Sequence, residues 1–246
     1  MARHKINVRG RIIPNDYKWF YDWFEEDSTC PRDVQKVLDQ AADGDDVDVY
    51  ISSPGGIISS GSDIYTMLRS AGDRLNIMIH ITGEAHSAAS VIACAARSEM
   101  SPTALMMVHC VSSGAVGNHS VLEKEAEVLR TADRALCTAY MAKAGMTEEE
   151  ALEMMEHETW LTAQQAKDRG LVDEIMFEEA EELPLTASVG TFRLPTSDQM
   201  AKVRAMMGED LSPAKEQTAP GYADAIRRTR EAEKLSATAG RFIGRH

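Results

Sequence analysis

Long apolar runs, paired cysteines and an excess of basic residues are all missing from this 246-residue sequence. No apolar stretch approaches the roughly 18 to 20 uninterrupted residues that a membrane-spanning helix needs. The N-terminal residues MARHKINVRG also lack the apolar segment of a secretory signal. We therefore expect a cytoplasmic protein that has no membrane partner.

Basic residues are outnumbered, with 26 Lys and Arg against 39 Asp and Glu, which gives a net charge of −13. A protein that binds nucleic acid through its charge needs a basic surface, so no nucleic-acid partner is expected. The cysteines are far apart and include no CxxC pair: Cys30, Cys94, Cys110 and Cys137. A chain of this length does not depend on disulfides for its core, so we predict reduced thiols.

Charge and composition change near residue 178. Residues 1–177 hold 16 basic and 28 acidic side chains, whereas residues 178–246 hold 10 and 11. The second part opens with an acidic run, contains four prolines and ends in residues 226–246 with six basic and two acidic side chains. We predict one folded domain at 1–177 and a flexible, proline-interrupted tail at 178–246 with two short helices.

Strand and helix patterns alternate in the first part. Val47, Val49 and Ile51 alternate with polar residues, as in a strand with one buried face. Further β-rich runs occupy 75–82 and 104–108, and helical patterns occupy 57–70 and 87–97. This order predicts an α/β fold of right-handed parallel crossover units. A long amphipathic helix is expected over 121–140, followed by two short helices that begin at capping boxes, Thr147 with Glu150 and Thr162 with Gln165.

Three of these strands end at residues of the kinds found in catalytic sites: Gly55-Gly56, Ser87 and His109. The carboxyl ends of parallel strands meet at one edge of a sheet, so these residues should converge there. A serine at the first turn of a helix lies near backbone N–H groups, and a Gly-Gly loop lets further N–H groups approach a substrate carbonyl. The combination is typical of a nucleophile, a base and an oxyanion hole.

Four segments in this order resemble the Clp-type serine peptidases, and more closely the ClpP-related head-maturation proteases of tailed phages. They are Ile51-Ser52-Ser53-Pro54-Gly55-Gly56, Gly83-Glu84-Ala85-His86-Ser87-Ala88-Ala89-Ser90, Met106-Met107-Val108-His109, and Glu158-Thr159-Trp160-Leu161-Thr162-Ala163 followed by Gly170-Leu171-Val172-Asp173. The resemblance covers residues 6–176 and implies a ClpP/crotonase-type α/β fold.

The resemblance also implies roles for single residues. Ser87 is the nucleophile, His109 the general base, and the Gly55-Gly56 loop with Ala88 forms the oxyanion hole, its N–H donors being those of Gly56 and Ala88. Glu158 stands where the family has its triad aspartate, with Asp173 as the alternative. No metal or cofactor is required.

Three neighbours could compete for these roles. His86 stands where the family usually has a small residue, Ser90 lies one helical turn after Ser87 and is expected to pack within the helix, and Cys110 should point to the opposite side of the strand from His109.

By the same resemblance, we expect a serine endopeptidase that forms a homo-oligomeric ring through the 121–140 helix. Its substrates would be scaffold or capsid proteins processed in phage head maturation, in the host cytoplasm or inside the prohead. Two alternatives stay open: a housekeeping degradative subunit that works with an ATP-dependent AAA+ unfoldase, and a catalytically silent crotonase-like assembly or acyl-CoA-binding protein. The long tail speaks against the first, and Ser87 together with His109 speaks against the second.

Truncation after Phe177 should keep oligomerisation and cleavage of a short peptide, because every motif named above lies before that point. Cleavage of the natural protein substrate should weaken if the basic end of the tail docks on an acidic partner through salt-sensitive contacts. The measurement compares peptide and protein cleavage by the truncated and full-length chains at low and high salt. Loss of the oligomer, or equal protein cleavage by both forms, would contradict this prediction.

Overall fold

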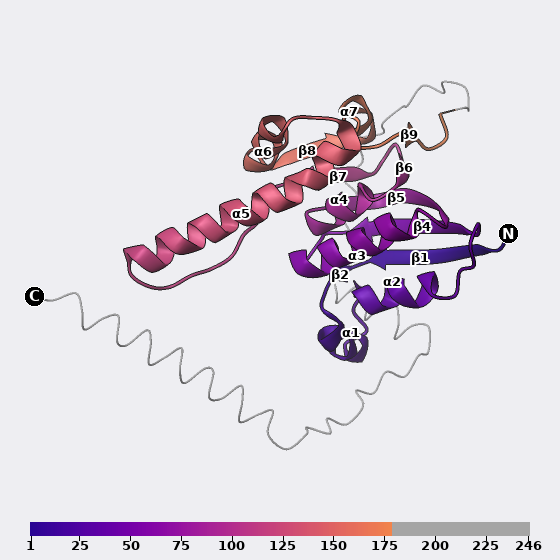
Figure 1. Ribbon diagram of the computed structural model, residues 1–246, viewed down its shortest axis with the longest axis horizontal. Helices are drawn as coiled ribbons and strands as arrows, with labels where there is room; N and C mark the ends of the chain where they lie inside the picture. Colours follow the sequence, from indigo (N-terminus) through magenta and orange to yellow (C-terminus); the bar gives the residue numbers. More distant parts are fainter. Residues whose placement is uncertain (179–246) are drawn as a thin grey trace, which may run out of the picture. The chain divides into compact units, whose positions relative to one another are not determined.

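A mostly parallel sheet organises residues 1–178, which are the residues that the computed structural model describes (Figure 1). The predicted tail therefore lies outside the described residues, apart from Glu178. Five strands follow the order β1-β4-β5-β6-β9, while β7 pairs with β5 and with β8. The strands of this sheet are β1 Arg3–Arg9, β4 Asp46–Ser53, β5 Asn76–His86, β6 Arg97–Met100, β7 Leu105–Val108, β8 Thr159–Thr162 and β9 Glu174–Ile175. Only the β7–β8 pair is antiparallel, which agrees with the predicted α/β fold.

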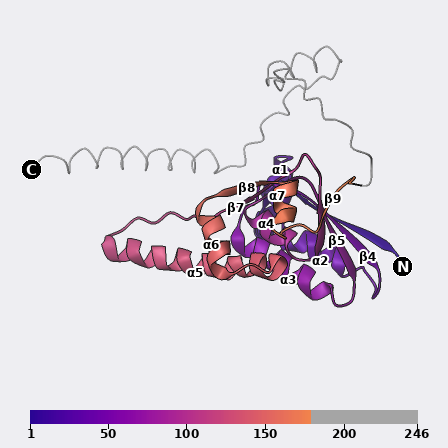
Figure 2. The same cartoon turned by 90° about the horizontal axis from the view of Figure 1, so that it is seen from above.

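The helices cover one face of the sheet and one end of it. Helices α2, α3 and α4 lie on the same face in both views (Figures 1 and 2), and the long α5 leads to the pair α6 and α7 beside β8. Their bounds are α1 Lys18–Trp23, α2 Pro31–Leu38, α3 Ile58–Ala71, α4 Ala88–Ala93, α5 His119–Ala144, α6 Glu148–Glu156 and α7 Ala163–Asp168. A short second sheet of β2 Arg11–Ile12 and β3 Ser28–Thr29 brackets the 3-10 turn Asn15–Tyr17 and α1.

Alternating hydrophobicity explains how the sheet buries its core. Along β4 every second side chain is fully buried, as predicted from Val47, Val49 and Ile51, and β5 adds Ile79 and Ile81. Isoleucine and valine favour this arrangement because a branched side chain packs well on a pleated, half-buried surface. Burial of each such side chain contributes about 1.5 to 3 kcal/mol. The strand register therefore fixes which residues reach the sheet edge where the motifs meet.

The helix termini follow the predicted capping signals. Thr147 and Thr162 each accept a hydrogen bond from the backbone three residues later, and Glu150 and Gln165 complete the two capping boxes. Gly145 ends α5 in a left-handed conformation and donates its N–H to Met141 at 2.8 Å. Such a C-terminal turn favours glycine because no Cβ is present to clash.

Two predicted bounds differ from the structure. The helix expected over 87–97 ends at Ala93, and the following residues turn into β6, which pairs with β5 from Met78 opposite Arg97. Strand β5 also runs past Gly83 as far as His86. Alanine favours helix over a short window, but strand pairing with a long neighbour outweighs that local preference.

No helix within residues 1–178 combines the length and the apolar character required to cross a bilayer. The four thiols are free, and those of Cys30, Cys94 and Cys137 are buried.

Tyr140→Phe should lower the free energy of unfolding by about 1 kcal/mol, since it deletes one buried hydrogen bond between α5 and α4. The Tyr140 hydroxyl lies 2.8 Å from Ser90 Oγ, and Ser90 keeps its own donor bond to the Ser87 carbonyl at 2.6 Å in the variant. Urea unfolding measures the difference. The matched control is Tyr17→Phe on an exposed tyrosine, which should change the stability little; equal stabilities for both variants would contradict the assignment.

Candidate active site

Ser87 stands at a strained turn between β5 and α4. Its backbone has φ 54° and ψ −125°, a region that residues other than glycine rarely adopt. The strain is held by neighbours: the Ser87 N–H donates to the Met107 carbonyl at 2.9 Å, and the Ser87 carbonyl accepts from the Ser90 N–H and hydroxyl. A strand-to-helix turn of this kind lifts the serine hydroxyl out of the sheet edge, where a substrate can reach it.

His109 follows β7 immediately and lies beside this serine. Its Nε2 is 2.8 Å from Ser87 Oγ, a hydrogen-bond distance, and both side chains are half-buried. The approach follows from the parallel pairing of β5 and β7, which sets His86 opposite Met107 and ends both strands at one edge. The sequence prediction that these two residues converge is in agreement with this geometry.

Gly55 and Gly56 come from the end of β4 and pack against the same turn. The Gly55 N–H donates to Ser53 Oγ at 3.1 Å, in line with the expectation that Gly56 and Ala88, and not Gly55, supply the free N–H groups of this loop and turn. Its contribution is close approach: a Cβ on Gly55 would lie 2.6 Å from the His86 carbonyl oxygen and 2.7 Å from the Ser87 Cβ. Only glycine allows this contact.

Gly56 and Ala88 supply N–H groups for which no acceptor is present within residues 1–178. Gly56, at φ 154°, bridges to Ile12, whose N–H donates to the Gly55 carbonyl and whose carbonyl accepts from Ile57. A Cβ on Gly56 would lie 2.2 Å from the Ile12 carbonyl oxygen, so glycine is required here as well. Ala88 is the first residue of α4, where N–H groups have no partner inside the helix.

A small cavity of about 90 Å³ opens at this point. It is lined by Gly56, Ile58, Ser87, Ala88, Val91, His109, Cys110, Val111, Ser112, Leu136 and Tyr140. Ser87, His109, Gly56 and Ala88 therefore all line one small hollow. N–H dipoles fixed in such a hollow before the reaction stabilise a developing negative charge.

Glu158 and His109 flank the last pair of β7 and β8, which sets Val108 opposite Thr159. No hydrogen bond joins the side chains of Glu158 and His109 within the described part of the chain. The Glu158 carboxylate instead accepts from the Trp160 indole N–H at 3.3 Å, and its backbone has φ 46°.

Asp173, the alternative third residue, is engaged elsewhere. Its carboxylate accepts from the Ser98 N–H at 2.7 Å and pairs with Lys143, which ties β6 to α5 just before β9 begins. Burial opposes ionisation of Asp173, but the hydrogen bonds from Lys143 and Ser98 outweigh it and lower its pKa. Asp173 thus links elements of the fold, away from His109.

Of the three competing neighbours, Cys110 lines the same cavity as His109, although the sequence predicted that it would point to the opposite side of the strand. Ser90 is fully buried and bonds to Tyr140, as expected for a packed side chain. Burial lowers the pKa of His86, with Glu84 acting against it, and the His86 ring stacks edge-on against Trp160 at 4.8 Å. Burial, together with the neighbouring Asp133, raises the pKa of Cys110 to about 11, so this thiol is protonated at neutral pH and is a poor nucleophile.

Asp133 was not predicted from sequence as a site residue. It is buried on α5, and its carboxylate accepts from the Val111 N–H at 2.7 Å, which fixes the chain directly after His109. One signal was present: Asp133 lies four residues after Leu129 and three before Leu136, on the apolar stripe of the amphipathic helix. A charged residue on such a stripe indicates a specific partner.

Residues 1–178 contain no group of three or more His, Cys, Asp or Glu side chains placed to hold a metal ion.

Comparisons with known proteins agree with this arrangement. The profile of the family described as Clp protease matches residues 33–179. Two ATP-dependent Clp protease proteolytic subunits from different strains of Bacteroides fragilis are 33% identical to the chain over 146 residues, or 58% of its length. The match spans 69% of one relative and 65% of the other. With the serine turn, the histidine and the glycine loop all inside a matched region of this extent, the chain belongs to the Clp protease family.

Proposed function

We propose that the protein is a serine endopeptidase in which Ser87 is the nucleophile and His109 the general base. The observation that supports this most is the 2.8 Å distance between Ser87 Oγ and His109 Nε2 at a strained strand-to-helix turn. A neutral serine hydroxyl is a weak nucleophile, and an adjacent imidazole that accepts its proton activates it. Membership of the Clp protease family supports the same reaction.

The reaction follows from the positions of the groups. Ser87 Oγ attacks the peptide carbonyl while His109 takes its proton, and the N–H groups of Gly56 and Ala88 bind the oxyanion of the tetrahedral intermediate. His109 then gives the proton to the leaving amine, which leaves an acyl-enzyme on Ser87. Water, activated by the same histidine, hydrolyses the ester. One missing oxyanion donor costs about 3 to 4 kcal/mol in comparable enzymes, so both N–H groups matter.

Glu158 is proposed as the carboxylate that orients His109 and stabilises its charged form. The register of β7 and β8 supports this role, because its last pair, Val108 with Thr159, adjoins both His109 and Glu158. Glutamate has a longer side chain than the aspartate expected at this position, and the Trp160 indole, which donates to Glu158, holds its carboxylate beside the strand pair.

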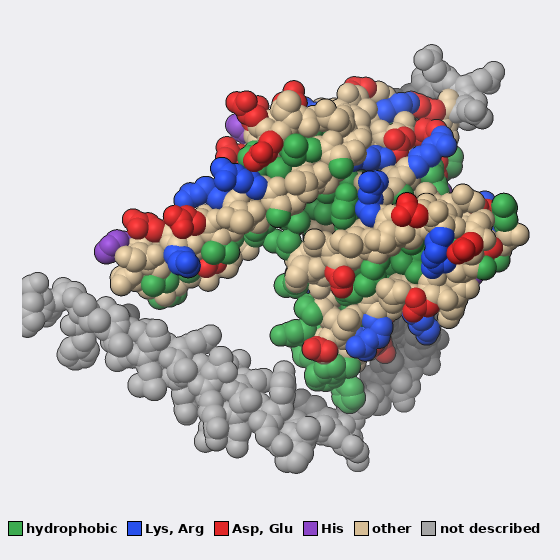
Figure 3. Space-filling model, viewed as in Figure 1, with side chains coloured by type: hydrophobic (Ala, Val, Ile, Leu, Met, Phe, Trp, Pro, Cys, Tyr) green, Lys and Arg blue, Asp and Glu red, His purple; other side chains and the backbone are tan. Residues whose placement is uncertain are grey.

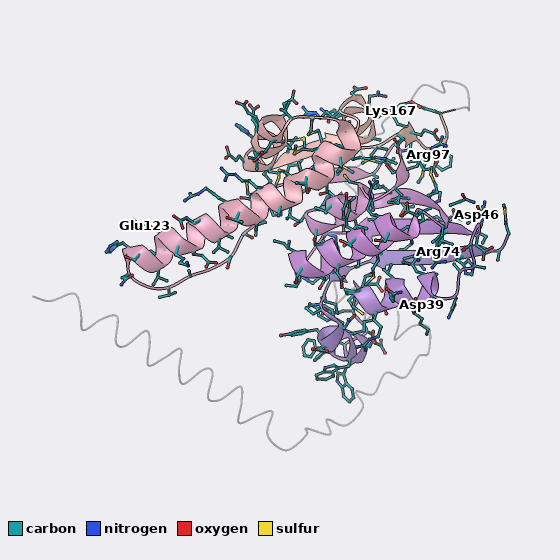
Figure 4. The ribbon with its side chains drawn as sticks, in the orientation of Figure 1. Asp39, Asp46, Arg74, Arg97, Glu123 and Lys167 are labelled. Carbon is teal, nitrogen blue, oxygen red and sulfur yellow. The ribbon has the colours of Figure 1, made fainter. Side chains whose placement is uncertain are left out.

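A ring assembly is proposed on the basis of α5. The first half of this 26-residue helix projects beyond the rest of the described residues, and Glu123 marks its free end (Figure 4). Val121, Leu122 and Val128 are exposed along it. Exposed apolar side chains on a projecting helix favour contact with another copy, and homo-oligomers usually close with symmetry.

The cellular role follows from the resemblance to phage head-maturation proteases: we propose that the protein cleaves scaffold or capsid proteins. The names of the two Bacteroides fragilis relatives support a second candidate, a degradative subunit that acts with an ATP-dependent unfoldase. Neighbouring portal and capsid genes, with cleavage of the adjacent scaffold protein in the absence of ATP, would support the first. Cleavage that requires ATP and an unfoldase would support the second.

Ser87→Ala should abolish peptide hydrolysis and fluorophosphonate labelling while the protein still folds, since the Ser87 side chain makes no capping hydrogen bond to α4 and alanine keeps the same Cβ. His109→Ala should be close to inactive for want of a base. Labelling followed by mass spectrometry identifies the modified serine, and Ser90→Ala and His86→Ala are the matched controls. Labelling that persists in Ser87→Ala, or activity that disappears in His86→Ala but not in His109→Ala, would overturn the assignment. A wild-type protein that takes up no label under any condition would favour the silent assembly protein.

Glu158→Gln should reduce kcat by roughly two to four orders of magnitude and leave KM nearly unchanged, because the amide no longer stabilises the charged imidazole. Asp173→Asn is the matched control and should keep its turnover. Its free energy of unfolding should instead be lower than that of the parent above about pH 4. The lowered pKa of Asp173 means that its carboxylate stabilises the parent only where it is ionised, so the difference between the two disappears as the pH falls further. Normal kcat in Glu158→Gln with a large loss in Asp173→Asn would transfer the third role to Asp173.

A further inference from the structure

Helix α1 exposes an unusual concentration of aromatic side chains. Residues 17–24 read Tyr-Lys-Trp-Phe-Tyr-Asp-Trp-Phe, and none of the six residues of α1 is buried. Trp19 is 68% exposed and Trp23 77%, and Tyr17, Phe20 and Phe24 are exposed beside them. Figure 3 shows hydrophobic side chains gathered over α1, and Figure 4 shows ring-bearing side chains that project away from the helix. Exposed apolar groups of this size mark an interaction surface.

The aromatic rings of this segment pack against one another. Phe20 packs against Trp19, Tyr21 and Phe24 at ring-centre distances of 5.9, 6.0 and 4.8 Å. The two ends of the segment 13–29, which contains α1, are joined where the Ile13 N–H donates to the Thr29 carbonyl at 2.9 Å. The surface is therefore presented on a defined scaffold, which lowers the entropy lost when a partner binds.

Acidic residues surround these rings. Asp16, Asp22, Glu25, Glu26 and Asp27 are all exposed, and residues 15–28 contain only one basic side chain, Lys18. Lys18 does not balance the negative charge of this surface. Its ammonium group is only partly exposed, because it donates to the Ser28 carbonyl at 2.8 Å and lies within 4 Å of Asp22 and Asp33. The surface thus combines aromatic faces with unbalanced negative charge.

We propose that α1 and its acidic surroundings form a docking surface for a positively charged, partly apolar segment of another protein. Arginine and lysine side chains are attracted both to carboxylates and to the faces of tryptophan rings, and their alkyl stems add apolar contact. A second copy of the chain fits less well. Residues 1–177 carry 28 acidic against 16 basic side chains, so a second copy would set negative charge against negative charge.

The position of the surface links it to the candidate active site. Ile12, which bridges to Gly56 of the oxyanion loop, is only six residues before Lys18 at the start of α1. A segment docked on α1 is therefore bound by the same stretch of chain that supports the glycine loop. The docking proposal does not rest on the peptidase function, because it concerns binding alone.

Binding is tested on the full-length chain carrying Ser87→Ala, so that no probe can be cleaved. The probe is a fluorescein-labelled peptide of 14 residues in which Arg alternates with Leu and Ser, and its counterpart has Glu in place of each Arg. We expect fluorescence anisotropy to show binding of the Arg peptide only. Trp19→Ala with Trp23→Ala should weaken it at least about fivefold, the usual effect of removing an interface aromatic. Asp22→Asn with Glu26→Gln should weaken it and reduce its dependence on salt.

Phe177→Ala is the matched control, because Phe177 is 77% exposed and follows β9 at the sheet edge opposite β1. It should bind the Arg peptide as the parent does. Circular dichroism checks that the variants stay folded, which is expected because no residue of α1 is buried.

The proposal is overturned if the two peptides bind equally, or if the α1 variants bind the Arg peptide as the parent does. If sedimentation shows that the Trp19/Trp23 variant loses an oligomer that the parent forms, the surface binds a second copy. If the parent binds phosphatidylcholine vesicles and the variant does not, the surface binds a membrane. Either result would also overturn the proposal.

Discussion

The backbone of Ser87 has a positive φ that costs free energy, of order 1 to 3 kcal/mol for a residue other than glycine, and the rest of the site depends on what maintains it. Three elements do so. Strand β7 accepts the Ser87 N–H, the first turn of α4 donates to the Ser87 carbonyl, and Gly55 of the β4 loop packs directly on the turn. Because the turn is over-determined in this way, the hydroxyl and the imidazole keep their geometry without a substrate. Catalysis by pre-placed groups requires this rigidity.

The same turn connects the candidate site to the long helix. Ser90 bonds both to the Ser87 carbonyl and to the Tyr140 hydroxyl, and Asp133 holds the backbone just after His109. Tyr140 and Asp133 both belong to α5, whose other half projects from the fold. A contact made by α5 with another copy would therefore act on an element that also holds Ser90 of the Ser87 turn and the segment that follows His109. Assembly and activity have a direct structural connection in such an arrangement.

Glu158, the residue proposed to orient His109, shows how a local sequence pattern and the tertiary structure address different questions. Glu158 precedes a capping threonine by four residues, a pattern that by itself fits a carboxylate near a helix N-terminus. Only the antiparallel pairing of β7 with β8 brings its segment beside the end of β7, and only the position of the Trp160 indole explains where its carboxylate is held. Asp173 could be excluded as a neighbour of His109 only once its bonds to Ser98 and Lys143 were seen. No spacing in the sequence encodes those distances.

Sequence alone determined the α/β class, the alternating core strand at Val47, Val49 and Ile51, the capped helices, and the likeness that selected Ser87 and His109. These features depend on interactions within a few residues or on motifs read in order, so they survive without knowledge of the fold. The tertiary structure decided that Gly55 donates to Ser53 and packs closely on the Ser87 turn, that Asp133 binds the chain just after His109, and that the α1 aromatics lie outside the core. An aromatic-rich segment predicts burial from composition, and whether it is buried depends on whether any other element packs against it. Contacts between residues distant in sequence are set by strand register and helix packing, and these are properties of the whole folded chain.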